Sequence, residues 1–287
     1  MLAWWQAIVL GLVEGITEYL PVSSTGHLIL VSALLGLDQG VAKDAVDDFL
    51  IVVQGGAILA VVGLYWARVR QIVNGLIGRD AEGLRLAINL GIAFVPAAIG
   101  GVLLNKTIKA HLFHAGPVLF ALAAGGVFML WLARQGADRG GSRTQDVAQL
   151  STGTALGIGL FQVLAMWPGT SRSMVTIGGG ILLGLDAVTA AEFSFLLGLP
   201  TLGAACGYDL LKNFKHAAET GGPNLFQQLG LMPVGIGILV AALSAAVAVR
   251  WLVGQLTHRG LGPFGWYRIG VAIVLGGLMA AGIVQIG

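Results

Sequence analysis

The sequence predicts an all-α integral membrane protein with six transmembrane helices and two re-entrant helical hairpins, arranged as an inverted repeat. Three observations lead to this prediction. The chain of 287 residues is 56% hydrophobic and only 10% charged, with a mean hydropathy of +0.85. Six continuous apolar runs are long enough to span a bilayer. Two further apolar stretches are interrupted by short polar motifs.

The composition excludes several other classes of protein. A soluble domain carries about 25% charged residues, so this chain lacks the polar side chains that would cover a water-facing globule. The apolar runs are unbroken, whereas strands of a membrane β-barrel alternate between apolar and polar residues. A net charge of +2 without a basic cluster offers no surface for nucleic acid. The single cysteine, Cys206, excludes an intramolecular disulfide framework. The N-terminus lacks the basic segment of a cleaved signal peptide.

Six runs are predicted to be ordinary transmembrane helices, and positive charge predicts how they are oriented. They cover residues 49–67, 86–104, 116–133, 193–211, 229–249 and 267–286. One side of the membrane then carries ten arginines, which are Arg68, Arg70, Arg79, Arg85, Arg134, Arg139, Arg143, Arg250, Arg259 and Arg268. The other side carries five lysines, which are Lys43, Lys106, Lys109, Lys212 and Lys215. Because basic residues concentrate in cytoplasmic loops, we expect loops 68–85, 134–151 and 250–266 in the cytoplasm.

The two interrupted stretches, residues 1–37 and 152–185, are predicted to be re-entrant hairpins. Polar backbone at membrane depth is tolerated only where protein buries it or where it lines a wet cavity. With the spans oriented as above, the first hairpin enters from outside and the second from the cytoplasm. The chain is then one membrane domain, 1–287, with halves 1–150 and 151–287. Segments 11–24 and 159–171 resemble each other, which supports a repeat with a site near the midplane.

A pair of acidic residues in the first hairpin points to a cation site. Glu14 and Glu18 stand four residues apart, so both carboxylates share one face of a helix. Their repulsion in an apolar environment needs a proton or a cation to offset it. A divalent metal held by carboxylates and substrate phosphates would do so. The alternatives are a proton relay or salt bridges to arginine.

The motif that follows, PVSSTGH (21–27), supplies hydroxyl groups and a histidine. Ser23, Ser24 and Thr25 beside His27 suit either phosphate binding or nucleophilic catalysis with a base. The alternative is that the hydroxyls bond to the backbone of a kinked helix and that His27 only packs.

The second motif, PGTSRS (168–173), places a lone arginine within a long apolar stretch. Arg172 needs an anionic partner there, and its planar fork suits phosphate. A helix beginning after the Pro-Gly pair would aim free N–H groups at the same anion. The expected phosphate-binding residues of this motif are Gly169, Thr170, Ser171 and Ser173. The alternative is a buried ion pair of Arg172 with Glu14, Glu18 or Glu192. Taken together, the two motifs predict a pocket for a phosphate ester or anhydride on a membrane-borne substrate.

The segments EGITEYLPVSSTGH (14–27) and PGTSRS (168–173) together resemble the bacterial undecaprenyl pyrophosphate phosphatases of the bacitracin-resistance type. The resemblance implies removal of the terminal phosphate from this polyprenyl diphosphate, yielding the monophosphate carrier of cell-wall synthesis. It implies two re-entrant helix pairs in inverted repeats, and a site that faces the periplasm and needs Mg²⁺ or Ca²⁺. His27 matches the family's catalytic histidine and Arg172 its phosphate-binding arginine. Met174 stands where many relatives have glycine, and an acidic residue before the arginine is not clearly matched, so Asp146 is left out of the site.

The expected reaction is metal-assisted hydrolysis of a lipid diphosphate. Glu14 and Glu18 would hold the cation, and Arg172 with the amides of both broken helices would cradle the phosphates. His27 would act as base or acid, and Ser24 or water would attack. The competing class is a transporter or flippase of a lipid phosphate, because inverted repeats are common in transporters. The expected location is the bacterial cytoplasmic membrane, and a homodimer is the further partner considered.

Overall fold

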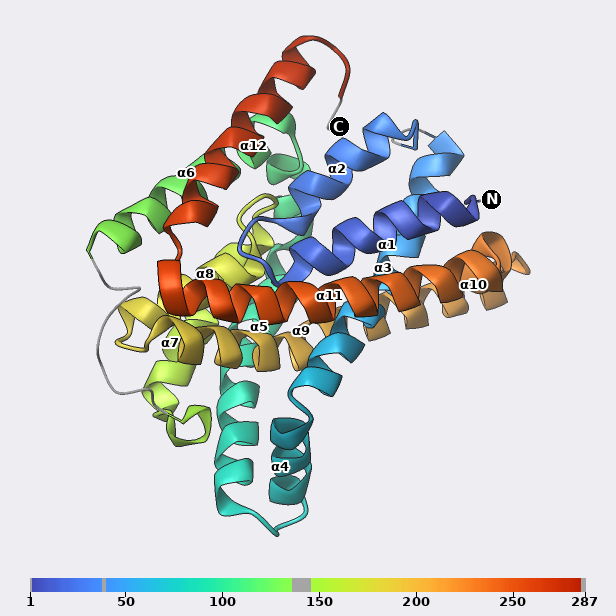
Figure 1. The fold of residues 1–287 in the computed structure, drawn as a ribbon. Helices are drawn as coiled ribbons and strands as arrows, with labels where there is room; N and C mark the ends of the chain where they lie inside the picture. Colours follow the sequence, from blue (N-terminus) through green and yellow to red (C-terminus); the bar gives the residue numbers. More distant parts are fainter. Residues whose placement is uncertain (1, 38–39, 136–145, 285–287) are drawn as a thin grey trace.

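The computed structural model describes residues 2–37, 40–135 and 146–284, and this part of the chain is built from helices without a β-strand (Figure 1). The α-helices are α1 (Trp4–Tyr19), α2 (Ser24–Leu34), α3 (Gly40–Leu64), α4 (Trp66–Leu76), α5 (Ala81–Leu112), α6 (Ala115–Arg134), α7 (Thr152–Val163), α8 (Arg172–Leu182), α9 (Ala187–Thr220), α10 (Leu225–Leu229), α11 (Leu231–Arg259) and α12 (Gly262–Ala280). Two short 3₁₀ segments are η2 (Val147–Gln149) and η3 (Leu164–Met166).

Six of these helices are long and apolar enough to cross a membrane. The candidate spans are Val46–Leu64, Ala81–Leu104, Ala115–Arg134, Ala187–Thr220, Leu231–Arg259 and Gly262–Ala280. Each one overlaps a run predicted from the sequence, so the prediction of an all-α membrane protein with six spanning helices is confirmed.

Several helices extend further than the hydrophobic runs indicated. The fourth predicted span, 193–211, belongs to α9, which has 34 residues. The predicted loop 250–266 is wrong for most of its length, because α11 continues to Arg259 and α12 begins at Gly262. Backbone hydrogen bonding continues where hydropathy falls, since lysine, arginine and glutamine are good helix formers. Within the predicted loop 68–85 lies most of α4. Arg139 and Arg143 of the predicted loop 134–151 lie outside the described residues.

The two interrupted stretches form short helical hairpins. In the first, α1 and α2 have 16 and 11 residues, and in the second, α7 and α8 have 12 and 11. Each is shorter than the ~20 residues needed to span a bilayer. The turns of the two hairpins meet, because the Ser173 hydroxyl donates a hydrogen bond of 2.9 Å to the carbonyl oxygen of Leu20. How the hairpins enter the membrane stays a prediction.

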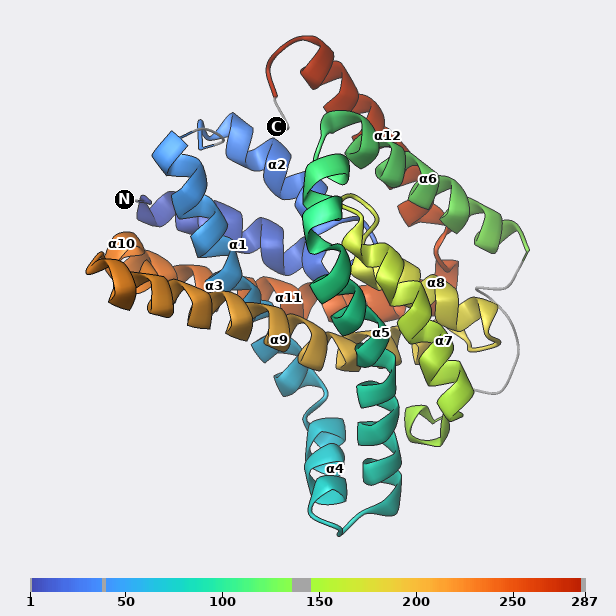
Figure 2. The same ribbon diagram turned by 180° about the vertical axis from the view of Figure 1, so that it is seen from behind.

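Each hairpin packs on a long helix from the other half of the chain. Helix α1 lies along α11, and α7 lies along α5 (Figures 1 and 2). The helix backbones approach each other closely at these contacts. A Cβ on Gly15 would overlap Ser244 and Ala241 of α11, and a Cβ on Gly159 would overlap Ala93 of α5. Small residues allow such close approach between membrane helices. The two halves therefore interlock.

The order of elements is the same in both halves of the chain. A hairpin is followed by a long helix, a short helix and two long helices, first in α1–α6 and then in α7–α12. Equivalent helices also pack against each other, α3 on α9 and α6 on α12. The boundary between halves near residue 150 stays a prediction. This arrangement brings the turn of each hairpin to the centre of the molecule.

Candidate active site

The candidate site lies where the two hairpin turns meet, and each turn has an unusual backbone. Ser23 and Ser171 both have φ of 74°, and they are the two residues other than glycine with positive φ in the described part of the chain. Each caps the helix that follows, with its hydroxyl oxygen accepting from the backbone N–H of Gly26 or Met174. Such backbone costs about 1–3 kcal/mol per residue and clusters at functional sites.

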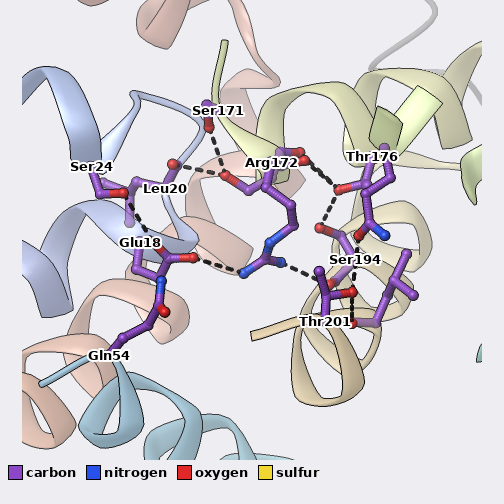
Figure 3. Close-up of polar contacts among 12 residues, drawn as sticks. Glu18, Leu20, Ser24, Gln54, Ser171, Arg172, Thr176, Ser194 and Thr201 are labelled. Carbon is purple, nitrogen blue, oxygen red and sulfur yellow. Dashed lines mark hydrogen bonds and ion pairs between the residues drawn. The ribbon is translucent and has the colours of Figure 1, made fainter. Parts of the chain in front are cut away.

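The second hairpin brings Arg172 to Glu18 of the first. Arg172 Nη2 lies 3.2 Å from Glu18 Oε1, and the two side chains are 9% and 6% exposed (Figure 3). The Ser24 hydroxyl donates to the other carboxylate oxygen, Oε2, at 3.0 Å. Arg172 Nη1 donates to the carbonyl oxygen of Ser194, and the guanidinium lies 5.1 Å from the centre of the Tyr19 ring. The buried ion pair that the sequence left as an alternative therefore exists.

Glu14 lies one helical turn before Glu18, buried on α1. It is 2% exposed, and its Oε2 has no hydrogen-bond partner within the described part of the chain. A buried carboxylate oxygen without a donor fits a cation ligand. Among the described residues no three His, Cys, Asp or Glu side chains converge on a metal position. A cation held by Glu14 and Glu18 would therefore need ligands from the substrate or from water as well.

His27 lies in the second turn of α2 and has both ring nitrogens occupied. Nδ1 lies 2.7 Å from the carbonyl oxygen of Ser23, and Nε2 lies 2.7 Å from the Tyr267 hydroxyl. A carbonyl oxygen only accepts, so we assign the hydrogen of the neutral ring to Nδ1. Nε2 then accepts from Tyr267, which holds the basic nitrogen in a defined direction. Tyr267 was not among the residues predicted from the sequence.

The other predicted phosphate ligands lie in or beside the two turns. Thr25 is half-buried in the first turn of α2. Thr170 precedes the capping Ser171, and its backbone N–H donates to Trp167. Ser173 is fully buried. Its hydroxyl donates to the carbonyl oxygen of Leu20 and is also hydrogen-bonded to the Ser171 hydroxyl. The carbonyl oxygen of Gly169 accepts from Arg268. The predicted site residues thus lie on α1 and in or beside the two turns, with Ser173 and Gly169 in structural contacts.

Arg268 requires a correction to the sequence analysis, which counted it among the arginines at the cytoplasmic boundary. Its side chain is fully buried. It donates to the carbonyl oxygens of four residues, which are Pro21, Ala121, Leu122 and Gly169. Pro21 and Gly169 belong to the two hairpin turns, so one guanidinium ties both turns to α6. Its partners are backbone oxygens, which leave no trace in the sequence.

Asp146 and Glu192 form ion pairs with Arg68 of α4, away from the two hairpin turns. Arg68 contacts Glu192 Oε1 at 2.8 Å and Asp146 Oδ1 at 2.9 Å. Burial acts to lower the pKa of Arg68, but the hydrogen bonds that it donates to Glu192 and Asp146, and the negative charge of these carboxylates, outweigh burial and raise that pKa. Asp146, which the sequence analysis leaves out of the site, thus has Arg68 as its partner.

Comparisons with known proteins all point to one family. The family model described as "Bacitracin resistance protein BacA" matches residues 7–274. The chain is 46% identical to a protein of Sorangium cellulosum named "Undecaprenyl-diphosphatase", over 95% of this chain and 85% of the relative. It is 44% identical to a protein of Methylococcus capsulatus with the same name, over 95% and 93%. A third protein of that name, from Deinococcus radiodurans, is 42% identical over 99% and 98%.

The contacts of Arg268 generate a testable prediction. Arg268→Lys keeps the charge, but an ammonium cannot reach four carbonyl oxygens, two in the turns and two on α6, at once. We expect a lower melting temperature in detergent, because buried carbonyls lose their donors at about 1–3 kcal/mol each. Nanoscale differential scanning fluorimetry measures this. Arg250→Lys, an exposed arginine on α11, is the matched control. Equal melting temperatures for the two variants would contradict the structural role.

Proposed function

This chain belongs to the bacitracin resistance protein BacA family, and on that premise we propose that it hydrolyses undecaprenyl pyrophosphate to undecaprenyl phosphate and inorganic phosphate. The observation that carries the proposal is the meeting of two helix N-termini, those of α2 and α8, at the Glu18–Arg172 pair. The product would serve again as the lipid carrier of cell-wall synthesis. The names of the relatives describe an enzyme. They do not favour the alternative, a transporter or flippase, that the sequence left open.

Phosphate binding falls to Arg172 and to the helix N-termini in this proposal. Helix N-termini attract anions through free N–H groups and the helix dipole. Arg172 Nε is buried without a hydrogen-bond partner in the described part of the chain, so this donor is available to a phosphate oxygen. Arg172 would turn one edge of its guanidinium from Glu18 to the substrate. The planar fork of the guanidinium suits bidentate contact with phosphate. Thr25, Thr170 and Ser171 line the same turns.

The acidic pair would hold a divalent cation, Mg²⁺ or Ca²⁺. Glu14 offers its unpaired Oε2, and Glu18 would offer the oxygen that Arg172 gives up. When bound, the cation supplies neutralisation of the charge on the phosphate oxygens.

Ser24 or a water molecule would attack the terminal phosphorus, with undecaprenyl phosphate as the leaving group. The Ser24 hydroxyl donates to Glu18 Oε2, which orients its oxygen lone pairs away from the carboxylate. Once Tyr267 releases Nε2 and the attacking hydroxyl turns its hydrogen toward His27, His27 would take that proton and give it to the leaving phosphate oxygen. If Ser24 attacks, a phosphoserine forms, and water then cleaves it to release inorganic phosphate.

The protein is a multi-pass membrane protein, and we propose that its site opens to the outer face of a bacterial cytoplasmic membrane. Basic residues support this orientation. In Figure 1 the arginine-bearing α4 lies at the bottom and the C-terminal ends of α6 and α11 lie at the left, whereas the N-terminus and the α9–α10 turn lie at the right. Pairing of two copies stays a prediction.

The first test of this function concerns Glu18. Glu18→Gln removes the negative charge that the cation and Arg172 share, so phosphate release from undecaprenyl pyrophosphate by the purified protein should be lost. Excess Mg²⁺ should not restore it. Glu219→Gln, an exposed glutamate on α9, is the matched control and should keep full activity. Full activity in Glu18→Gln would remove Glu18 from the cation site, and no release by the wild-type protein would refute the function itself.

The second test concerns the shape of the Arg172 side chain. Arg172→Lys retains the charge but loses the planar fork, so kcat/KM should fall more than tenfold, about 1.4 kcal/mol. Arg259→Lys, at the exposed end of α11, controls for the chemical change. A smaller loss would mean that Arg172 acts as a point charge or as the ion-pair partner of Glu18.

The third test concerns orientation. In a Cys206→Ser background, Lys212→Cys on α9 and Arg70→Cys on α4 place single thiols at exposed positions on opposite sides. An impermeant maleimide added to intact cells should label residue 212 and spare residue 70. Labelling of residue 70 alone would reverse the proposed topology and turn the site toward the cytoplasm.

A further inference from the structure

An apolar groove lies beside the candidate site, between α1, α11 and α12. It has a volume of about 770 Å³. Its walls include Leu12 and Ile16 of α1, Leu243 and Val247 of α11, and Phe264 and Tyr267 of α12. Several of these side chains are open to the surroundings, with Leu243 61% and Tyr267 49% exposed. In Figures 1 and 2 these helices lie together at the turn of the first hairpin, where α12 begins.

The groove is continuous with the site through residues that belong to both. Tyr267 lines the groove and binds His27 Nε2 through its hydroxyl. Thr17 and Leu20 also line it, and they flank Glu18 and Tyr19 on α1. The carbonyl oxygen of Leu20 accepts from Ser173 of the second hairpin. A molecule whose chain lies in the groove therefore has its head at the meeting point of the two hairpin turns.

We propose that this groove holds the isoprenoid chain of the substrate where that chain leaves the diphosphate, an inference that rests on the proposed function. The groove wall is almost wholly hydrocarbon, which excludes a polar occupant. Its volume falls in the range of roughly 300–1,000 Å³ typical of sites for compact ligands. It has room for several isoprene units, and the remainder of a long chain would continue into the bilayer.

The groove would act by positioning the substrate. Lipid tails are as apolar as leucine, so moving an isoprenoid from bilayer to groove yields little hydrophobic free energy. What the groove provides is a fixed direction for the chain, which keeps the terminal phosphate from drifting out of reach of Arg172 and Ser24. A misplacement of about 1 Å can cost about 10²-fold in rate.

Filling the groove tests this proposal. In Leu243→Trp the larger ring occupies the space of the chain, so kcat/KM for undecaprenyl pyrophosphate should fall about tenfold or more. The loss should be smaller for isopentenyl diphosphate, whose single isoprene unit hardly enters the groove. The matched control is Leu160→Trp on α7, because Leu160 is a leucine with 59% exposure away from the groove. Equal values for both variants on the long substrate would overturn the proposal.

Photocrosslinking gives a readout that does not require hydrolysis. A polyprenyl diphosphate with a diazirine on its second isoprene unit should label peptides of α1 and α11 that line the groove, and undecaprenyl phosphate should compete. Labelling elsewhere would overturn the proposal. Labelling that phospholipid displaces but undecaprenyl phosphate does not would assign the groove to bilayer lipid. Groove labelling without phosphate release by the wild-type protein would keep the groove and refute the proposed hydrolysis instead.

Discussion

Arg268 is fully buried, and its guanidinium holds the backbone of three separate segments in place. A charged arginine inside a membrane protein costs about 2.5–3.5 kcal/mol on insertion scales. Hydrogen bonds to a charged group contribute about 1.5–3 kcal/mol each, so the four carbonyl acceptors are enough to offset that cost. Because two acceptors belong to the hairpin turns, the position of every site residue in those turns depends on this one side chain.

The two turns would be costly structures on their own. Each contains a serine with positive φ, and in each that serine caps the helix that follows. Glu18 and Arg172 neutralise each other across the contact, and Ser173 joins the second turn to Leu20. Since every one of these interactions crosses between the hairpins, neither turn keeps its geometry without the other. The backbone of both turns is thus in place before any substrate arrives, and only the Arg172 side chain and the Tyr267 hydroxyl would have to change partners.

The sequence predicts most of this architecture because its strongest signals concern length and polarity. Long apolar runs mark the spanning helices, and Pro21 and Pro168 with their polar neighbours mark the two turns. The need of Arg172 for an anion correctly indicates Glu18 among its alternatives. Arg268 was misassigned because its partners are carbonyl oxygens, which every residue possesses. Tyr267 was missed for a similar reason, since a tyrosine near the start of an apolar run equally suits a membrane boundary. Helix ends were underestimated where polar residues continue the helix.

The interlocking of the halves has a consequence for how the chain is made. Helix α1 leaves the ribosome well before α11, the helix on which it packs, because α11 follows it by more than 200 residues. At about 5–20 residues per second, α1 therefore waits roughly 10–50 s for its partner. For most of that interval Glu14 and Glu18 also lack Arg172, which follows Glu18 by 154 residues. The nascent hairpin of α1 and α2 is thus a segment that the insertion machinery, or an assisting chaperone, has to protect until α11 has been made.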